Sequence, residues 1–316
     1  MNYIFRTQVD VSPHKLQYGV GTKLFSIGSC FADSVVSRLR ERQVEVYSNP
    51  YGVVYNPDSI SKQIMRVVGA EEIKDGEIVN IKSSYSSFMA HGSINAPSEK
   101  LLKEKLRAIA AESYEKLISA NIVLITYGTS WVYEHVERGI IVANCHKVDG
   151  RMFNRRVLTL EELRRSIQQT ILSIRKVNSG ATVIFTVSPI RHMSDGVHGN
   201  QYSKSLLHVA LEEEIVQNEG NVSYFPSYEI VLDDLRDYRF YSSDMVHPSE
   251  VAVDYVFLKF SEVYFTEEMR RYMQDGEKLS KILNHRPMGG EEAEVEHKRL
   301  VDDRLGEFRK RWGDLC

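Results

Sequence analysis

Three short apolar segments constrain the fold of this sequence more than any other feature. They span residues 23–27, 122–127 and 182–187, and a polar turn with glycine, serine or proline follows each of them. Near-continuous apolar runs of this length are typical of strands that are buried on both faces of a parallel sheet. We therefore expect these segments to be buried strands of a mainly parallel sheet.

Helix signals lie between and after these segments. Thr159 and Glu162 match a capping box, and the apolar spacing behind them predicts a helix that ends at Asn178. Ser203 is expected to cap a second helix, and Ser249 a third. Strands that alternate with helices predict an α/β protein with a mainly parallel sheet and helices on both faces. Ligands of such sheets bind beyond the carboxyl ends of the strands.

The end of the chain has a different character. Residues 266–316 are highly charged and helical in propensity, and a segment with proline and two glycines interrupts them at 284–290. We predict one domain over residues 1–265 and a charged helical extension over 266–316. The extension is expected to pack on the core or on a second copy of the chain in a homo-oligomer.

Composition excludes several classes of protein. The formal net charge is −3 and no basic cluster stands out, so we expect no nucleic-acid partner. No apolar stretch approaches the ~20 residues that span a bilayer.

Residues 1–8 lack the pattern of a secretory signal, which favours a cytoplasmic location. Three cysteines, Cys30, Cys145 and Cys316, are too few for a disulfide framework and are expected to be free thiols.

The turn Gly28-Ser29-Cys30 is the first candidate for chemistry. It joins a predicted strand to a predicted helix, so Cys30 lies at a helix N-terminus, where unpaired N–H groups favour a thiolate. The alternative is structural: Ser29 caps the helix, and Cys30 is a small buried residue. The turn alone does not decide between the two.

Asp244 and His247 form the second candidate, in a loop before the helix that Ser249 caps. A carboxylate three residues before a histidine can accept its Nδ1–H and leave Nε2 free as a general base. Arg191 and His192 follow a strand and could bind an anionic group of a substrate, or form a structural ion pair. Cys145 and His146 are too few ligands for zinc, so we expect neither a metal nor a cofactor.

Several strings of this sequence resemble the bacterial GSCFA-domain family. Gly28-Ser29-Cys30-Phe31-Ala32 is the signature that gives the family its name. Similar matches are Asn49-Pro50-Tyr51-Gly52, Tyr127-Gly128-Thr129-Ser130-Trp131-Val132-Tyr133, Asn144-Cys145-His146-Lys147, Ser188-Pro189-Ile190-Arg191-His192, Asn200-Gln201-Tyr202-Ser203-Lys204 and Arg236-Asp237-Tyr238-Arg239-Phe240-Tyr241.

The GSCFA family is similar to the SGNH, or GDSL-type, hydrolases, which have a three-layer flavodoxin-like fold and act on esters, often acyl groups of glycans. The resemblance puts Cys30 in the place of their nucleophilic serine, with Ser29 as the other candidate. It also implies that the backbone N–H of Gly52 donates a hydrogen bond to the negatively charged oxygen, or oxyanion, of the reaction intermediate.

The third SGNH block reads Gly-x-Asn, but here it is Gly128-Thr129-Ser130, so Ser130 or Asn144 would replace the missing asparagine. The last block, Asp-x-x-His, matches fully at Asp244 and His247.

The candidate residues and the resemblance together predict an acyl-ester hydrolase. The resemblance implies carbohydrate O-acyl esters as its substrates. Cys30 or Ser29 attacks, His247 is the base, Asp244 orients it, and an acyl-enzyme forms. One alternative is an O-acyltransferase that passes the acyl group to a glycan or lipid hydroxyl. Another is a catalytically impaired glycan-binding protein, which the missing Gly-x-Asn asparagine favours.

Overall fold

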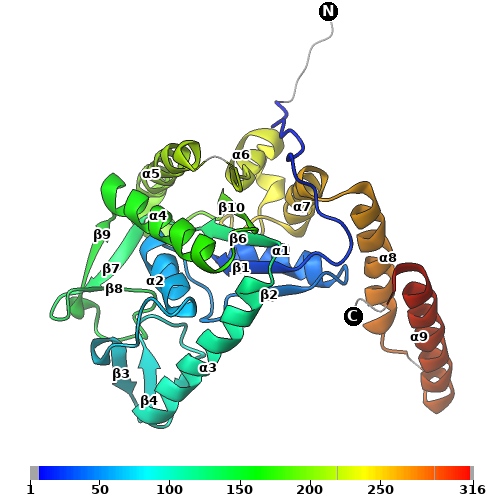
Figure 1. Ribbon diagram of the computed structural model, residues 1–316, viewed down its shortest axis with the longest axis horizontal. Coiled ribbons are helices and arrows are strands. Elements are labelled where there is room, and N and C mark those ends of the chain that lie inside the picture. The colour runs from blue at the N-terminus through cyan, green and yellow to red at the C-terminus, as the bar shows by residue number, and fades with distance from the viewer. Residues whose placement is uncertain (1–6, 219, 288, 314–316) are drawn as a thin grey trace, which may run out of the picture.

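The computed structural model describes residues 7–218, 220–287 and 289–313 (Figure 1). Cys316 lies outside these ranges. Within them, a five-stranded parallel sheet forms the centre, in the order β11–β10–β6–β1–β2. The strands are β1 (Leu24–Gly28), β2 (Val46–Ser48), β6 (Ile122–Tyr127), β10 (Thr182–Val187) and β11 (Val222–Tyr224).

The three apolar segments singled out in the sequence are the three inner strands. β1 pairs with β6 along its whole length, so that Gly28 lies opposite Thr126, and β6 pairs in turn with β10. From β1 the chain moves first to β2 on one side and then back past β1 to β6 on the other. This reversal is the topological switch point of a flavodoxin-like sheet, the place where such folds bind ligands.

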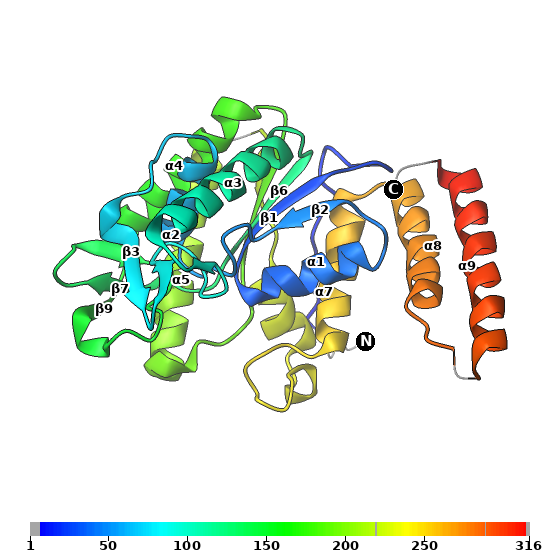
Figure 2. The ribbon, with the colours of Figure 1, turned by 90° about the horizontal axis from the view of Figure 1, so that it is seen from below.

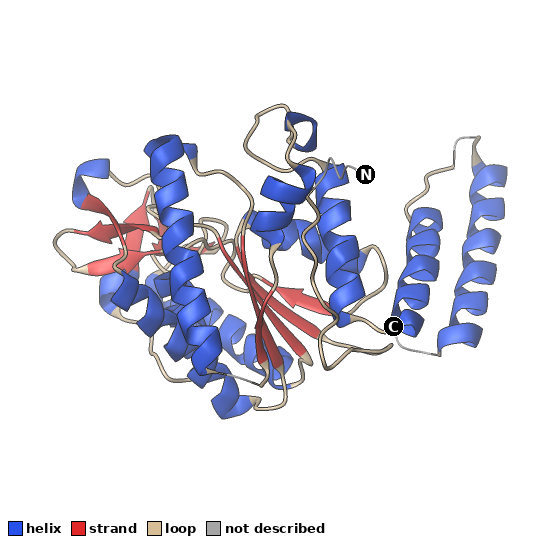
Figure 3. Ribbon diagram, turned by 90° about the horizontal axis from the view of Figure 1, so that it is seen from above, coloured by secondary structure: helices blue, strands red, loops and turns tan. Residues whose placement is uncertain are grey.

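Alternate strand residues enter two different apolar clusters, because successive side chains of a strand point to opposite faces. Phe25, Val123 and Ile125 belong to one cluster, whereas Leu24 and Leu124 belong to the other. Helices therefore cover both faces (Figure 3), and the predicted α/β fold class is confirmed. Residues of α2 (Pro57–Val67), α3 (Glu99–Ile118), α4 (Leu160–Val177) and α5 (Gly196–Gln217) join the first cluster, and those of α1 (Cys30–Arg40) and α7 (Glu250–Tyr264) the second.

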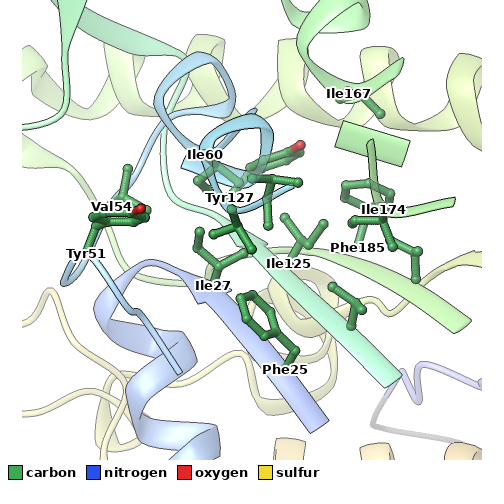
Figure 4. Close-up of a cluster of buried hydrophobic side chains, with 14 of the residues drawn as sticks. Phe25, Ile27, Tyr51, Val54, Ile60, Ile125, Tyr127, Ile167, Ile174 and Phe185 are labelled. Atoms are coloured by element: carbon green, nitrogen blue, oxygen red, sulfur yellow. The ribbon is translucent and has the colours of Figure 1, made fainter. Parts of the chain in front are cut away.

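Figure 4 shows the first cluster, in which strand side chains meet Ile167 and Ile174 of α4. The helix begins where the sequence predicts, because Thr159 and Glu162 form both bonds of the capping box. The predicted cap of α7 by Ser249 is also present.

The start predicted for α5 is wrong. The helix begins at Gly196, and Ser203 lies inside it instead of capping it. The Ser203 hydroxyl forms hydrogen bonds with Thr129 and Ser130 in the turn after β6. A serine in the middle of a helix is thus bonded to a segment that is distant in the sequence.

Two small antiparallel sheets were not predicted. They flank one end of the central sheet in Figure 1. One consists of β3 (Ile78–Ile81), β4 (Ser84–Ser87) and β5 (Asn95–Ala96), and the other of β7 (Trp131–His135), β8 (Ile140–Val142) and β9 (Phe153–Val157). Short helical turns lie at η1 (Asp75–Glu77), η2 (Gly150–Met152), η3 (Met193–Asp195), α6 (Ser227–Glu229), η4 (Ile230–Leu235) and η5 (Tyr238–Phe240).

The C-terminal segment is helical, as expected. α8 (Glu267–Leu283) packs beside the end of α1, where the Tyr272 hydroxyl donates to the Gln43 carbonyl at 2.7 Å. α9 (Glu291–Trp312) lies against the outer side of α8, away from the sheet (Figure 2). The division into a domain over 1–265 and an extension over 266–316 stays a prediction. None of the described helices combines the length and apolar character that crossing a bilayer requires.

Gly28 offers a direct test of the central strand pairing. Its φ is +150°, and a Cβ atom there would lie 2.2 Å from the Thr126 carbonyl oxygen. We expect Gly28→Ala to lower the free energy of unfolding by about 3 kcal/mol, because strain and a backbone clash add. Gly76→Ala is the control, since open space surrounds Gly76, and it should change stability by less than ~0.5 kcal/mol. Equal urea midpoints for the two variants would contradict this account.

Candidate active site

Cys30 is the first residue of α1 and directly follows the turn at the end of β1. The turn is held by the Ser29 N–H, which donates to the Thr126 carbonyl at 3.1 Å, and by the Gly28 N–H, which donates to Asn49 Oδ1 at 2.8 Å. Cys30 is partly exposed and lines a cavity at the carboxyl edge of the sheet. The switch point between β1 and β6 thus carries a thiol at its surface.

Asp244 and His247 lie in a tight turn before α7. One Asp244 oxygen accepts the N–H groups of Val246 and His247 at 2.9 and 3.0 Å. Met245, which lies between Asp244 and Val246, has a left-handed φ of +58°. The other oxygen lies 2.7 Å from His247 Nδ1. The N–H groups of His247 and Val246 lower the pKa of Asp244 to about 2. A carboxylate only accepts hydrogen bonds, so Nδ1 carries the proton and Nε2 is left as an acceptor.

Cys30 and the pair of Asp244 and His247 lie next to each other in the structure. Cys30 Sγ lies 3.9 Å from His247 Nε2, within the loose range of a nucleophile and its base before substrate binds. Asp244, His247 and Cys30 therefore form a continuous chain from carboxylate to imidazole to thiol. More than 200 residues separate the two halves of this chain in the sequence, and the fold brings them together.

The thiol is not preformed as a thiolate. Burial raises the pKa of Cys30 above its usual value, and this outweighs the opposite effect of the N–H groups of Cys30 and Phe31 at the start of α1. The helix N-terminus alone is thus too weak to ionise this cysteine. An adjacent base is needed instead, and His247 is in the position to act as one.

Ser29, the other candidate nucleophile, lies elsewhere. Its side chain is fully buried, and its hydroxyl makes no hydrogen bond with any described residue. It is the N-cap of α1 without bonding through its side chain. Cys30 is therefore in contact with His247, whereas the Ser29 hydroxyl is buried away from the cavity surface.

The expected oxyanion donors are mostly occupied. The Gly52 N–H donates to the Asn49 carbonyl at 2.7 Å, and the Gly128 N–H to the Tyr55 carbonyl at 2.7 Å. Gly52 is outside the lining of the Cys30 cavity. Its φ of +80° and the 2.2 Å between its ideal Cβ position and His91 Cβ point to a structural need for glycine there.

Ser130 and Asn144, the two candidates to replace the missing asparagine, differ in their access to the cavity. Ser130 is fully buried, and both its N–H and its hydroxyl bond to Ser203. Asn144 lines the cavity, and its Oδ1 accepts the His146 N–H at 2.8 Å. Its backbone N–H bonds to the Phe88 carbonyl, on the side of the small antiparallel sheets.

Arg191 and His192 both line the cavity. No described carboxylate pairs with Arg191, whose guanidinium instead stacks 4.5 Å from the centre of the Tyr241 ring. Burial, with the nearby charge of Lys204, lowers the pKa of His192 to about 4, so this ring is neutral at physiological pH. Its Nε2 is buried without a hydrogen-bond partner among the described residues.

The cavity measures about 630 Å³ and extends from Cys30 and His247 to the sheet β8–β7–β9. Trp131 and Tyr133 of β7 form part of its wall, and the Arg155 guanidinium lies 5.3 and 4.5 Å from their ring centres. The sequence does not predict this wall, because the short strands that form it carry no clear alternation of apolar and polar residues.

Lys204 is a further residue whose place the sequence did not reveal. Its side chain is fully buried, and its Nζ donates to the carbonyls of Gly128 and Ser188, each at 2.6 Å. These carbonyls directly follow β6 and β10, so one ammonium group joins two loops below the cavity. Burial lowers the pKa of Lys204 to about 7. A lysine in mid-helix gives no sequence signal for this role.

Comparison with known proteins identifies the family. The sequence model of the GSCFA family matches residues 23–260. The chain belongs to the GSCFA family. The resemblance found in the sequence strings is thereby confirmed. No curated protein matches the chain.

Solved structures similar to this GSCFA protein include carbohydrate esterases. A family two carbohydrate esterase from Clostridium thermocellum has 10% identity and a TM-score of 0.39, over 79% of this chain and 63% of the esterase. A family 3 carbohydrate esterase from Talaromyces cellulolyticus has 9% identity and a TM-score of 0.37, over 80% and 99%. An acetyl xylan esterase from the rumen bacterium Butyrivibrio proteoclasticus has 12% identity and a TM-score of 0.39, over 81% and 67%.

No cluster of metal-ligating side chains occurs among the described residues of this GSCFA protein. His146, which adjoins Cys145, places its Nε2 2.7 Å from the Ser87 carbonyl. Its ring thus has a structural partner.

The state of Cys30 can be measured by alkylation. We expect the rate of reaction with iodoacetamide, followed at the Cys30 peptide by mass spectrometry, to reach half its maximum above the ordinary thiol pKa of about 8.5. The reason is that burial raises the Cys30 pKa, so the reactive thiolate forms only at higher pH. The urea-unfolded protein is the control and should titrate at the ordinary value. A midpoint below neutral pH in the folded protein would show a preformed thiolate and contradict this expectation.

Proposed function

We propose that this GSCFA protein is an ester hydrolase in which Cys30 is the nucleophile, His247 the general base and Asp244 the residue that orients the base. The chain of contacts from Asp244 through His247 to Cys30, at the mouth of a cavity, carries this proposal. A thiol, an imidazole and a carboxylate in this order are the parts of a nucleophile–base–orienter triad.

The first half of the reaction forms a thioester. His247 Nε2 takes the thiol proton as Cys30 Sγ attacks the ester carbonyl carbon, and the carbonyl oxygen becomes an oxyanion. When this intermediate collapses, the C–O bond to the alcohol breaks, and the imidazolium returns its proton to the leaving alkoxide. The acyl group then remains on Cys30. Asp244 accepts the Nδ1–H throughout and stabilises the imidazolium.

The second half regenerates the enzyme. His247 takes a proton from a water molecule, whose oxygen attacks the thioester carbonyl carbon. The C–S bond breaks, the carboxylic acid leaves, and the proton returns to Cys30 Sγ. The backbone N–H of Cys30, in the first turn of α1, is close enough to the sulfur to lower its pKa, and it has no intrahelical partner. This N–H supports the oxyanion in both halves.

The proposed substrates are carbohydrate O-acyl esters. This choice rests on the resemblance of the family to SGNH hydrolases, which often act on acyl groups of glycans. The cavity lining is compatible with it, because it joins apolar side chains such as Val132 and Phe153 to polar ones such as Asn144 and Arg191. Such a mixed wall suits a short acyl chain next to a hydroxylated ring.

Variants of the triad test the proposal with 4-nitrophenyl acetate and an O-acetylated xylo-oligosaccharide as substrates. We expect Cys30→Ala and His247→Ala to lower kcat by at least ~10³-fold, and Asp244→Asn by ~10²–10⁴-fold, since asparagine does not hold the required tautomer. Ser29→Ala is the matched control and should keep the turnover of the wild type. Loss of activity in Ser29→Ala with full activity in Cys30→Ala would move the nucleophile to Ser29. Equal turnover in all four variants would exclude the triad.

Trapping and product analysis separate hydrolysis from the alternatives. Acid quenching during turnover should leave a mass increase of one acyl group on the Cys30 peptide, and this increase should be absent in Cys30→Ala. Free carboxylic acid as the product supports hydrolysis, whereas an acylated sugar formed when a glycan acceptor is added indicates transfer. Binding of the oligosaccharide without any Cys30-dependent turnover would favour a glycan-binding protein.

A further inference from the structure

Neither Gly52 nor the turn Gly128-Thr129-Ser130 has a free N–H or side chain to act as a second oxyanion donor in the proposed reaction. One backbone N–H at Cys30 is insufficient for most acyl transfers, in which two or more donors converge on the oxygen. The N–H groups of Gly52 and Gly128 are bonded to carbonyls, and Ser130 is bonded to Ser203. A donor for this role must be fixed in place, face the cavity and lack a protein partner.

The segment of residues 54–56 crosses the switch point beside Cys30. The Val54 N–H donates to the Gly28 carbonyl at 3.1 Å, which joins this segment to the end of β1. The Tyr55 carbonyl accepts the N–H groups of Gly128 and Thr129 at 2.7 and 3.1 Å, which joins it to the end of β6. Asn56 follows immediately and lines the same cavity as Cys30.

The Asn56 side chain is held in one orientation. It caps α2, because its Oδ1 accepts the Ser59 N–H at 2.8 Å. With Oδ1 committed to the helix, the two N–H donors of Nδ2 point away from it, and they make no hydrogen bond with any described residue. Asn56 is 5% exposed and belongs to the lining of the cavity that Cys30 also lines. Because Oδ1 is bonded to the Ser59 N–H, the Nδ2 group is the part of this side chain that is available to a ligand in the cavity.

We propose that Asn56 Nδ2 and the Cys30 backbone N–H together bind the oxyanion of the acyl-transfer intermediates. This inference rests on the proposed function. In it, Asn56 supplies the amide that Gly128-Thr129-Ser130 lacks, from a different loop on the same edge of the sheet. Asn144, the other asparagine of the cavity, is held in a similar way, since its Oδ1 accepts the His146 N–H. Its backbone N–H, however, is bonded to the Phe88 carbonyl, whereas the segment of Asn56 is bonded directly to the ends of β1 and β6.

The test must remove the donor and keep the helix cap. Asn56→Ser keeps an oxygen that caps α2 but is too short to reach the substrate, and Asn56→Asp keeps the cap and replaces the donor by a charge. We expect kcat for 4-nitrophenyl acetate to fall by ~10²–10³-fold in Asn56→Ser, and further in Asn56→Asp, with little change in KM. Both variants should unfold at nearly the temperature of the wild type.

A distant cap gives the control for stability. Ser98 caps α3 and is not part of the cavity lining, so Ser98→Ala should lower the unfolding temperature and keep kcat. Asn56→Ser with the kcat of the wild type, alongside inactive Cys30→Ala, would overturn this inference alone. A large fall in Asn144→Ala instead would assign the donor to Asn144. Absence of Cys30-dependent turnover in the wild type would overturn the proposed function and this inference together.

Discussion

The close approach of Gly28 to the Thr126 main chain is the contact on which the rest of the site depends. At this point β1 and β6 are paired and the chain must also leave the sheet, and no side chain fits between the two backbones. The Ser29 N–H then bonds to Thr126 as well, so α1 begins at once with Cys30 at its first position. A thiol is thereby placed at the switch point of the sheet, where the fold has room for a ligand.

Hydrogen bonds to main-chain carbonyls connect the loops around this thiol. Lys204 joins the loops after β6 and β10, and the Arg191 N–H donates to the Val246 carbonyl at 3.3 Å, which attaches the histidine turn to the loop after β10. His247 is therefore positioned by its own turn and by a neighbouring loop. Rigid placement of this kind is what a nucleophile and its base need, because small displacements strongly reduce the rate.

The electrostatics of the cavity follow from burial. The pKa of Cys30 is raised, that of His192 is lowered to about 4, and that of Lys204 is lowered to about 7, in each case mainly because burial disfavours the charged form. Such an environment keeps the thiol neutral until a base acts on it. A hydrogen bond to an oxyanion is stronger in such an environment than in water, which supports the proposed role of the Asn56 amide.

Local patterns in the sequence were sufficient for much of the fold. The three inner strands, the capped helix α4 and the helical C-terminal segment were predicted because apolar periodicity and capping residues act within a few positions of one another. The pair of Asp244 and His247 was also visible, since its spacing is local. The strands of the outer sheets were missed because they have two to five residues each and most of them mix apolar and polar side chains without regular alternation.

Only the tertiary structure decided which polar atoms are occupied and which are free. Ser203 was expected at a helix start, but its partner in the turn after β6 places it inside α5. Asn56 before Pro57 is typical of a helix start, but nothing in the sequence near Asn56 or Lys204 indicates which distant segments lie against their side chains. A hydrogen-bonding group is either satisfied or available according to the segments that fold against it, and those segments are far away in the chain. The sequence by itself therefore determined the three inner strands, the helices α1, α4 and α7 and the residue types at the edge of the sheet. The packing of distant segments decided the edge strands β2 and β11 and which polar residues face the cavity.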